Sequence, residues 1–459
     1  MQDEQSEDTP EQRFDQYIGK LTEVIGHADR AEPLRAYCTG LLLPGERKSV
    51  EPMAARIEPS KVSSRHQSMH HFVAEAPWSD EDFLAVAREF ALPVFDAHGG
   101  VASWALDDTG FPKQGKHSVG VAHQYCGQLG KQANCQVAVT LSLINEWASL
   151  PMAFRLYLPE SWTKDPERCR KAGVPEAVRF QEKPKIALAQ IRAALEAGVP
   201  KGVVTADAAF GNDTAFRDEL TELNVRYAVG IQPTTSVWPE GKGPLPPAEW
   251  KGNGRRPSRP RRDDDHKPVS VKELALRHEP SAYRKVTWRE GSRGAMSSRF
   301  CALRVRAAHR DYERGEVRDE EWLLIEWPEG EKEPTKYYLS TLPKRASLKK
   351  LVFTVKLRWR IERDYEELKQ EIGFGHYEGR GWRGFHHHTA LSIAAYAFLV
   401  AERGRFSPSG VGGGTPKLKA ARVPRGFRPR GAPDPARTPQ PDVDRLNANT
   451  SDRRAGPQA

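Results

Sequence analysis

The chain has 459 residues, of which 29% are charged and 38% are hydrophobic, and its formal net charge is +9. Because this length exceeds what one hydrophobic core can hold, two or three domains are expected. The longest nearly apolar stretch, residues 390–401, is shorter than the about 20 residues that cross a bilayer. The composition therefore argues against a membrane protein and favours one of the cytoplasm.

Cysteine usage and the two chain ends support the same compartment. The five cysteines form no Cys-x-x-Cys pair, so neither a disulfide framework nor a zinc site is indicated. Residues 1–12 are acidic and polar, which predicts disorder and argues against a secretory signal. Residues 403–459 hold 12 Lys or Arg against 4 Asp and are rich in Pro and Gly. They are predicted to form a disordered basic tail that can attract DNA phosphates without sequence preference.

Residues 13–95 alternate helical patterns with turns. Phe14, Ile18 and Leu21 recur at helical spacing, and Ser79, followed by three acidic residues, is typical of a capped helix start. Cations are scattered through the segment without forming a run. This part of the chain is predicted to be an N-terminal helical domain.

Two short apolar runs then end in carboxylates. Residues 101–108 have the pattern of a strand that ends in Asp107 and Asp108 before a Thr-Gly turn. Residues 202–207 repeat this plan and end in Asp207. An acid at the end of an apolar strand is costly to bury unless another group pairs with it.

The rest of the chain up to residue 402 alternates helix and strand patterns. Two helices and a strand are predicted at residues 185–197, 212–223 and 225–231. Strand-like runs follow at residues 300–305, 322–327 and 337–339. Together the patterns predict a mixed α/β fold whose core has two parts, residues 96–231 and 341–402, interrupted by a β-rich insertion at 232–340.

A Gly- and Pro-rich loop inside the insertion carries closely spaced cations: Arg255, Arg256, Arg261 and Arg262. Three aspartates follow directly at residues 263–265. We expect the four arginines to bind DNA phosphates, and the alternative is a solvated loop without a partner.

A charged stripe is predicted on a helix over residues 355–369. At 100° per residue, Arg358, Glu362 and Lys369 lie within about 40° of one another, so one carboxylate shares a face with two cations. The apolar side chains fall on a neighbouring arc and leave this stripe available. The same Arg-x-x-x-Glu spacing is also common on solvated helices, where it contributes only about 0.2–0.5 kcal/mol.

Three adjacent histidines, residues 386–388, open an apolar helix after this stripe. On a helix they point in different directions, so they cannot all bind one metal ion. We expect one or two of them to reach a phosphate group.

Two strand-end aspartates and a helical glutamate are the ligands that a pair of hard divalent cations requires. Mg²⁺ prefers oxygen ligands and uses one or two carboxylates per ion. In a two-metal site the ions stabilise both the attacking and the leaving oxygen of a phosphoryl displacement. These residues therefore indicate cleavage or transfer of nucleic-acid strands.

The spacing of the helical motif resembles the YREK signature, Tyr-x2-Arg-x3-Glu-x6-Lys, of bacterial DDE insertion-sequence transposases. Arg358, Glu362 and Lys369 match it, whereas Val355 stands where the family has Tyr. Residues 106–121 and 377–388 also resemble the subgroup in which the first Asp is followed by Thr-Gly. The resemblance spans residues 13–402 and implies an RNase H-like catalytic core.

The resemblance also implies roles for individual residues. The first catalytic acid would be Asp108, because the family has the acid directly before Thr, and Asp107 is the alternative that strand alternation alone does not exclude. Asp108, Asp207 and Glu362 would hold two Mg²⁺ ions, for which Mn²⁺ can substitute. Arg358 and Lys369 would contact DNA phosphates.

The function implied is cut-and-paste DNA transposition, with Mg²⁺-dependent cleavage at transposon ends and strand transfer to target DNA. The partners would be double-stranded end and target DNA, gripped in part by residues 13–95, and a second copy of the chain in a homodimer associated with the nucleoid. Two alternatives remain open: an inactive transposase-derived DNA-binding protein, and a metal-dependent nuclease that cuts without joining strands.

Overall fold

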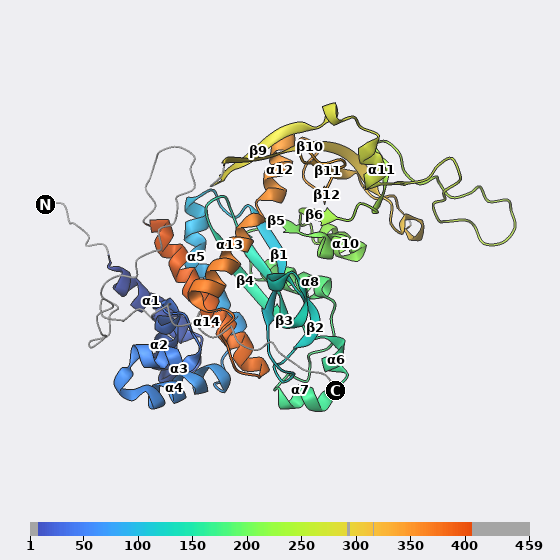
Figure 1. The fold of residues 1–459 in the computed structure, drawn as a ribbon. Coiled ribbons are helices and arrows are strands. Elements are labelled where there is room, and N and C mark those ends of the chain that lie inside the picture. Colours follow the sequence, from blue (N-terminus) through green and yellow to red (C-terminus); the bar gives the residue numbers. More distant parts are fainter. Residues whose placement is uncertain (1–7, 292–293, 315, 406–459) are drawn as a thin grey trace, which may run out of the picture.

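The computed structural model describes residues 8–291, 294–314 and 316–405 (Figure 1). Most of the two predicted disordered ends, residues 1–7 and 406–459, lies outside this description. The ordered part begins earlier and ends later than predicted. The first helix starts at Pro10 behind a capping box formed by Thr9 and Gln12, and the last helix continues through residues 403–405.

The N-terminal region consists of helices, as its sequence pattern predicts: α1 (Pro10–Glu23), α2 (Ala31–Leu42), α3 (Val50–Ile57), α4 (Val62–Ala74) and α5 (Asp80–Ala97). They pack on the C-terminal helix α14 (Trp382–Arg405), whose side chains are nearly all buried. Tyr17, for example, donates a hydrogen bond from its hydroxyl group to the carbonyl of Ala394 at 3.0 Å. Within the described ranges, no helix is long and apolar enough to cross a membrane.

Five strands form the central sheet in the order β4-β3-β1-β5-β6. Their bounds are β1 (Ser103–Pro112), β3 (Lys131–Ile144), β4 (Ser149–Leu156), β5 (Val203–Ala206) and β6 (Tyr227–Ile231). The first three pair in antiparallel fashion, and β1, β5 and β6 run parallel. This arrangement, with helices on both faces, is the mixed α/β, RNase H-like core that the sequence predicts.

Smaller elements connect these strands: β2 (Ala122–Cys126), α6 (Glu160–Thr163), α7 (Pro166–Lys171), α8 (Lys183–Glu196), α9 (Ala208–Gly211) and α10 (Thr214–Glu222). Helix α8 lies on one face of the sheet, where Gln190 donates to the carbonyl of Val139. Helices α13 (Trp359–Glu367) and α14 cover the other face. β1 continues through Asp107, Asp108 and the predicted Thr-Gly turn to Pro112, so the prediction that this strand ends at its acids is wrong. The acids of β1 and the one that follows β5 lie between two helical layers.

The insertion extends the same sheet rather than forming a separate one. Its elements are β7 (Ser236–Pro239), β8 (Val269–Ser270), α11 (Val271–Leu276), β9 (Arg284–Gly291), β10 (Gly294–Ala307), β11 (Glu321–Trp327) and β12 (Lys336–Ser340). Strand β12 pairs with the core strand β6, and β11, β10, β7 and β8 follow outward. The predicted strand runs are confirmed, and the sheet curves away from the core at its edge (Figure 1).

The helix predicted over residues 355–369 is interrupted. Helix α12 (Leu348–Lys356) has Leu357 as its C-cap, and α13 begins one residue after Arg358. A π-helical segment, Leu368–Ile372, follows and stops at Gly373, whose φ of +80° favours glycine. The charged stripe therefore does not lie on one regular helix, and its members point to different neighbours.

Candidate active site

Asp107 is the acid on β1 that faces helix α13. It lies opposite Thr140 of β3, and its Oδ1 atom accepts a hydrogen bond from Nη2 of Arg358 at 2.7 Å. Burial raises the pKa of Asp107 to about 6, and the neighbouring carboxylates of Asp207 and Asp108 add to this, although the charge of Arg358 opposes it. The guanidinium thus offsets part of the cost of a carboxylate that is only 19% exposed.

Asp207 directly follows β5 and is exposed. Its Oδ1 atom accepts a hydrogen bond from the backbone N–H of Ala209 at 2.9 Å, so it caps the short helix α9. Asp213 caps the next helix, α10, in the same way. This hydrogen bond holds the carboxylate at the strand end.

The strand register explains why Asp107 and Asp207 meet. Parallel pairing aligns Ser103 with Val203 and Ala105 with Thr205, so each residue of β1 lies beside the residue one hundred positions later. Extending this offset by two residues brings Asp107 beside Asp207. In a parallel pair, residues in matching positions point to the same face.

Glu362 completes the group from the first turn of α13, where it is exposed. The pKa of Arg358 is raised: burial alone would lower it, but the charges of Asp107, Asp207, Tyr365 and Glu362 together outweigh burial. Arg358 is therefore the cation that all three acids on this face share.

Asp108 points to the opposite face of the sheet, because side chains alternate along a strand. Its Oδ2 atom lies 2.5 Å from Nζ of Lys183 in the first turn of α8. Both side chains are about 30% exposed, at 28% and 30%. The structure therefore brings Asp107, and not the expected Asp108, to the side of Arg358, Asp207 and Glu362.

Lys369 lies in the π-helical segment rather than on α13. Its ammonium group donates to the carbonyl of Gly110 at 3.0 Å and to the side chain of Gln128 at 3.2 Å. Burial lowers its pKa. The side chain thus contacts the end of β1, near the acids but engaged within the protein.

The arginines of the insertion loop divide into two pairs. Arg262 binds Asp311 and the carbonyl of Ala308, each at 2.6 Å, and Arg261 lies 3.8 Å from Asp263. Arg255 and Arg256 are exposed. The segment between β7 and β8 that carries all four projects away from the central sheet (Figure 1). The loop is therefore remote from the acids.

The donor set can be compared with what a metal ion needs. In the described ranges, no three His, Cys, Asp or Glu side chains are close enough to hold a metal ion. The three acids on the Arg358 side offer only oxygen ligands, which suits Mg²⁺, and two of them, Asp207 and Glu362, are exposed side chains that can change rotamer. The chemistry of the donors fits a divalent cation.

Helix α13 is anchored by residues that the sequence analysis did not identify. Asp364 is buried, and its Oδ1 atom accepts hydrogen bonds from Ser149 at 2.6 Å and Tyr396 at 2.9 Å. Burial raises the pKa of Asp364 to about 6. Tyr365 hydrogen-bonds Thr140, the partner of Asp107 in the sheet. The sequence clue to this buried role was the position of Asp364 beside the apolar arc of the helix.

The three histidines of α14 do not reach a surface where phosphate could bind, so that expectation is wrong. All three are buried. The ring nitrogens of His387 contact the carbonyls of Val73 and Trp78, and His388 contacts Tyr37 and the carbonyl of Gly373. These histidines join α14 to the N-terminal helices.

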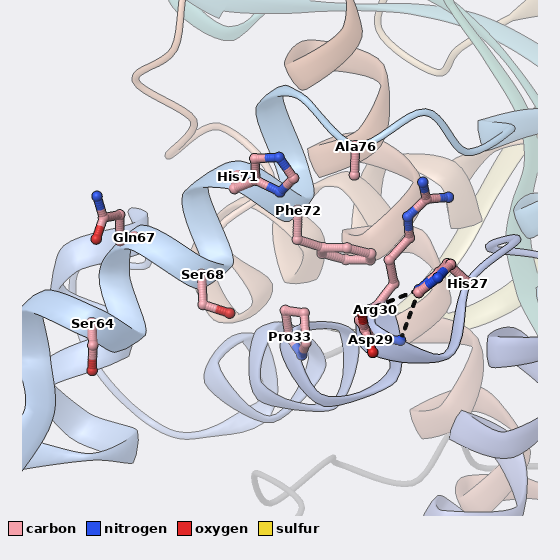
Figure 2. A pocket seen from close by; sticks show the side chains of 10 residues that line it. All are labelled: His27, Asp29, Arg30, Pro33, Ser64, Gln67, Ser68, His71, Phe72 and Ala76. Carbon is pink, nitrogen blue, oxygen red and sulfur yellow. Dashed lines mark hydrogen bonds and ion pairs between the residues drawn. The ribbon is translucent and has the colours of Figure 1, made fainter.

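Two surface hollows lie away from the acids. One, of about 670 Å³, is lined by N-terminal residues that include His27, Arg30, Gln67 and His71 (Figure 2). The other, of about 490 Å³, lies between α10 and the insertion. Neither is lined by Asp107, Asp207 or Glu362. The acids lie outside both hollows.

Two comparisons show which known proteins the chain is similar to. Residues 20–295 match the family model described as DDE superfamily endonuclease. A protein of Microchaete diplosiphon described as a probable transposase for insertion sequence element IS701 is 31% identical over 167 residues. That alignment covers 36% of this chain and 40% of the relative, so less than half of either protein is compared.

Proposed function

The chain belongs to the DDE superfamily endonucleases, and we propose that it is a transposase that cuts DNA at the ends of an insertion sequence and joins the freed strand to target DNA. The observation that carries this proposal is that Arg358 hydrogen-bonds Asp107 and that the charges of Asp107, Asp207 and Glu362 all act on it. Three distant segments of the chain supply these groups. The alternative of a structural ion pair would require only one acid.

We further propose that Asp107, rather than Asp108, is the first metal ligand. Its support is the parallel register of β1 and β5 and the hydrogen bond to Arg358. Asp108 is paired with Lys183 on the other face. The metal ligands would then be Asp107, Asp207 and Glu362, and two Mg²⁺ ions would activate water and neutralise charge on the scissile phosphate.

The side chains themselves do the remaining work. Asp107 holds its carboxylate in the middle of β1 and Asp207 directly after the neighbouring strand β5, and the Arg358 guanidinium balances the excess negative charge before DNA binds. In the first reaction a water oxygen bonds to phosphorus and the bond to the 3′ oxygen breaks. The freed 3′-hydroxyl group then attacks a second phosphate and displaces its 3′ oxygen, which conserves the number of phosphodiester bonds.

Double-stranded DNA is the proposed substrate, both at the element ends and at the target. Because two ends must be joined in one event, a homodimer is the simplest assembly. Arg358, Lys369 and the insertion arginines Arg255, Arg256, Arg261 and Arg262 remain proposed DNA contacts. For Arg358 and Lys369 this requires that their present intramolecular contacts be exchanged for phosphates.

The test is a cleavage and joining assay with Mg²⁺ and a duplex that carries the flanking end of the element. Asp107→Asn, Asp207→Asn and Glu362→Gln should each lower cleavage at least about 10²-fold, the loss typical of removing one electrostatic stabiliser. Asp108→Asn is the matched control and should stay within about tenfold of wild type. Loss of activity in Asp108→Asn with activity retained in Asp107→Asn would reverse the assignment.

The products distinguish the other functions. Joined strands support transposition, whereas cut but unjoined strands indicate a nuclease. Bound and intact DNA with every variant, including wild type, indicates a protein that only occupies its sites.

A further inference from the structure

The chain segment that leads into the Arg358 region is free of carboxylates. Between Pro334 and Ile361 there are eight Lys or Arg residues and no Asp or Glu. These cations are Lys336, Lys344, Arg345, Lys349, Lys350, Lys356, Arg358 and Arg360. Such a run is uncommon on a solvated helix, where acids and bases usually alternate.

The three cations closest to the acids are engaged inside the protein. Lys356 lies 2.7 Å from the buried Glu326, Arg358 binds Asp107, and Arg360 donates to the carbonyl of Trp147. The other five are exposed: Lys336 lies on β12, and the remaining four lie in and just before α12. Lys344, Arg345, Lys349 and Lys350 are exposed, and no carboxylate within the described ranges forms an ion pair with them.

Helix α12 carries two of these four side chains, Lys349 and Lys350, and the other two lie in the turn that precedes it. Its apolar face, which includes Leu351, Val352 and Val355, is buried against the sheet. Ser347 caps the helix by accepting a hydrogen bond from the backbone N–H of Lys350 at 3.2 Å. Lys349 and Lys350 therefore project from a rigid, packed helix. Because no ion pair in the part of the chain that the structure describes neutralises their charge, they are available to bind an anionic partner.

We propose that Lys344, Arg345, Lys349 and Lys350, the α12 patch, bind the phosphate backbone of double-stranded DNA next to the cleavage site. Lys349 and Lys350 lie on α12, the helix that directly precedes Arg358 and α13 along the chain. One DNA backbone can therefore contact the patch while a nearby phosphate lies at the acids. This proposal rests on the proposed function, because it takes DNA as the substrate.

The geometry also explains why this surface suits a backbone rather than bases. Lysine ammonium groups bind phosphate as point charges, and such contacts position DNA without reading its sequence. The exposed cations of the patch, unlike Arg261 and Arg262 of the insertion loop, have no acid beside them. The α12 patch is therefore the better phosphate-binding surface of the two.

The experiment measures DNA affinity by fluorescence anisotropy over a series of KCl concentrations, with EDTA present so that no cleavage occurs. Lys349→Ala/Lys350→Ala should reduce the slope of log affinity against log salt by about 1.8, because each lost phosphate contact removes about 0.9. Lys344→Ala/Arg345→Ala should act similarly from the preceding loop. If both variants lower the slope, the cause is the loss of charge and not a local change in helix α12.

The matched control is Lys164→Ala/Lys171→Ala, which removes the same charge from α6 and α7 at the opposite end of the molecule (Figure 1). Its slope should equal that of wild type. If both α12 variants also keep the wild-type slope, the patch does not bind DNA. An equal slope change with duplex RNA would overturn the assignment to DNA. The salt slope is read with EDTA and without cleavage, whereas the catalytic proposal is read from cleavage with Mg²⁺, so failure of either proposal is scored separately.

Discussion

Arg358 and Asp107 are separated by 251 positions in the chain, yet the Nη2 atom of Arg358 lies 2.7 Å from the Oδ1 atom of Asp107. This ion pair fastens the start of α13 to the middle of β1, across the face where Asp207 and Glu362 also lie. The hydrogen bond therefore has two effects. It orients the carboxylate of Asp107, and it reduces the repulsion among the three neighbouring carboxylates.

Replacing Arg358 tests both effects. In Arg358→Ala the pKa of Asp107 should rise above about 6, because burial and the charge of Asp207 remain while the opposing cation is lost. The rate of DNA cleavage should fall, and its dependence on pH should shift to higher pH. Arg358→Lys should restore part of the activity. A pH profile of Arg358→Ala identical to that of wild type would contradict this electrostatic role.

Acidification should weaken metal binding through Asp107. A metal ligand must be ionised, and the pKa of Asp107 is raised to about 6. Affinity for Mn²⁺, measured by calorimetry without DNA, should therefore fall up to tenfold per pH unit below about 6 and level off above it. Asp108→Asn should keep this pH dependence, with a slightly lower midpoint because the charge of Asp108 also raises the pKa of Asp107. If the affinity does not change between about pH 5 and 7, the assignment is contradicted, because the ligand would then titrate in the ordinary range of carboxylates.

Asp364 should destabilise the protein once it is ionised. Its pKa is raised from 3.8 to about 6, so the stability it contributes in the protonated form is lost as pH rises through that window. Asp364→Asn mimics the protonated form. Above about pH 6 it should be more stable than wild type by up to about 3 kcal/mol, and the difference should vanish below about pH 4. Urea unfolding at several pH values measures this difference.

His387 should make the junction of α14 and the N-terminal helices sensitive to acid. Burial lowers its pKa from 6.5 to about 4, so its contribution to stability is present above pH 6.5 and is lost as pH falls through this window. His387→Phe keeps the stack on Trp78, whose ring lies 3.6 Å away. At neutral pH it should lose about 1 kcal/mol through its missing hydrogen bond, but it should resist acid better than wild type. Thermal unfolding measured from about pH 7 to 4.5 tests this, because the range covers most of the interval between the pKa values of His387 in the unfolded and folded protein.

Gly211 should be required for the position of Asp207. A Cβ atom at this residue would lie 2.0 Å from the carbonyl oxygen of Gly230, so Gly211→Ala must push α9 away from β6. We expect a loss of about 1–3 kcal/mol and reduced cleavage. The control is Gly19→Ala in α1, where nothing lies within 4 Å and about 1 kcal/mol should be gained. Equal stability of the two variants would show that α9 can move freely.

The sequence by itself determined the elements and their order. Apolar runs that end in Asp, the helical periodicity of residues 13–95 and the β-rich insertion are local properties, because they depend on side-chain spacing along the chain. The motif with Arg358, Glu362 and Lys369 indicated the family on the same basis. Each of these predictions needed only neighbouring residues.

The tertiary structure alone decided which groups face one another. Side-chain alternation puts Asp107 and Asp108 on opposite faces of β1, but only the packing of helices on the two faces decides which of them meets Arg358. Burial, which no local pattern encodes, turned the histidines of α14 into internal contacts and left the cations of α12 exposed. Long-range packing decides these points, since the hydrogen bonds of Arg358 to Asp107 and of Ser149 to Asp364 join residues more than two hundred positions apart.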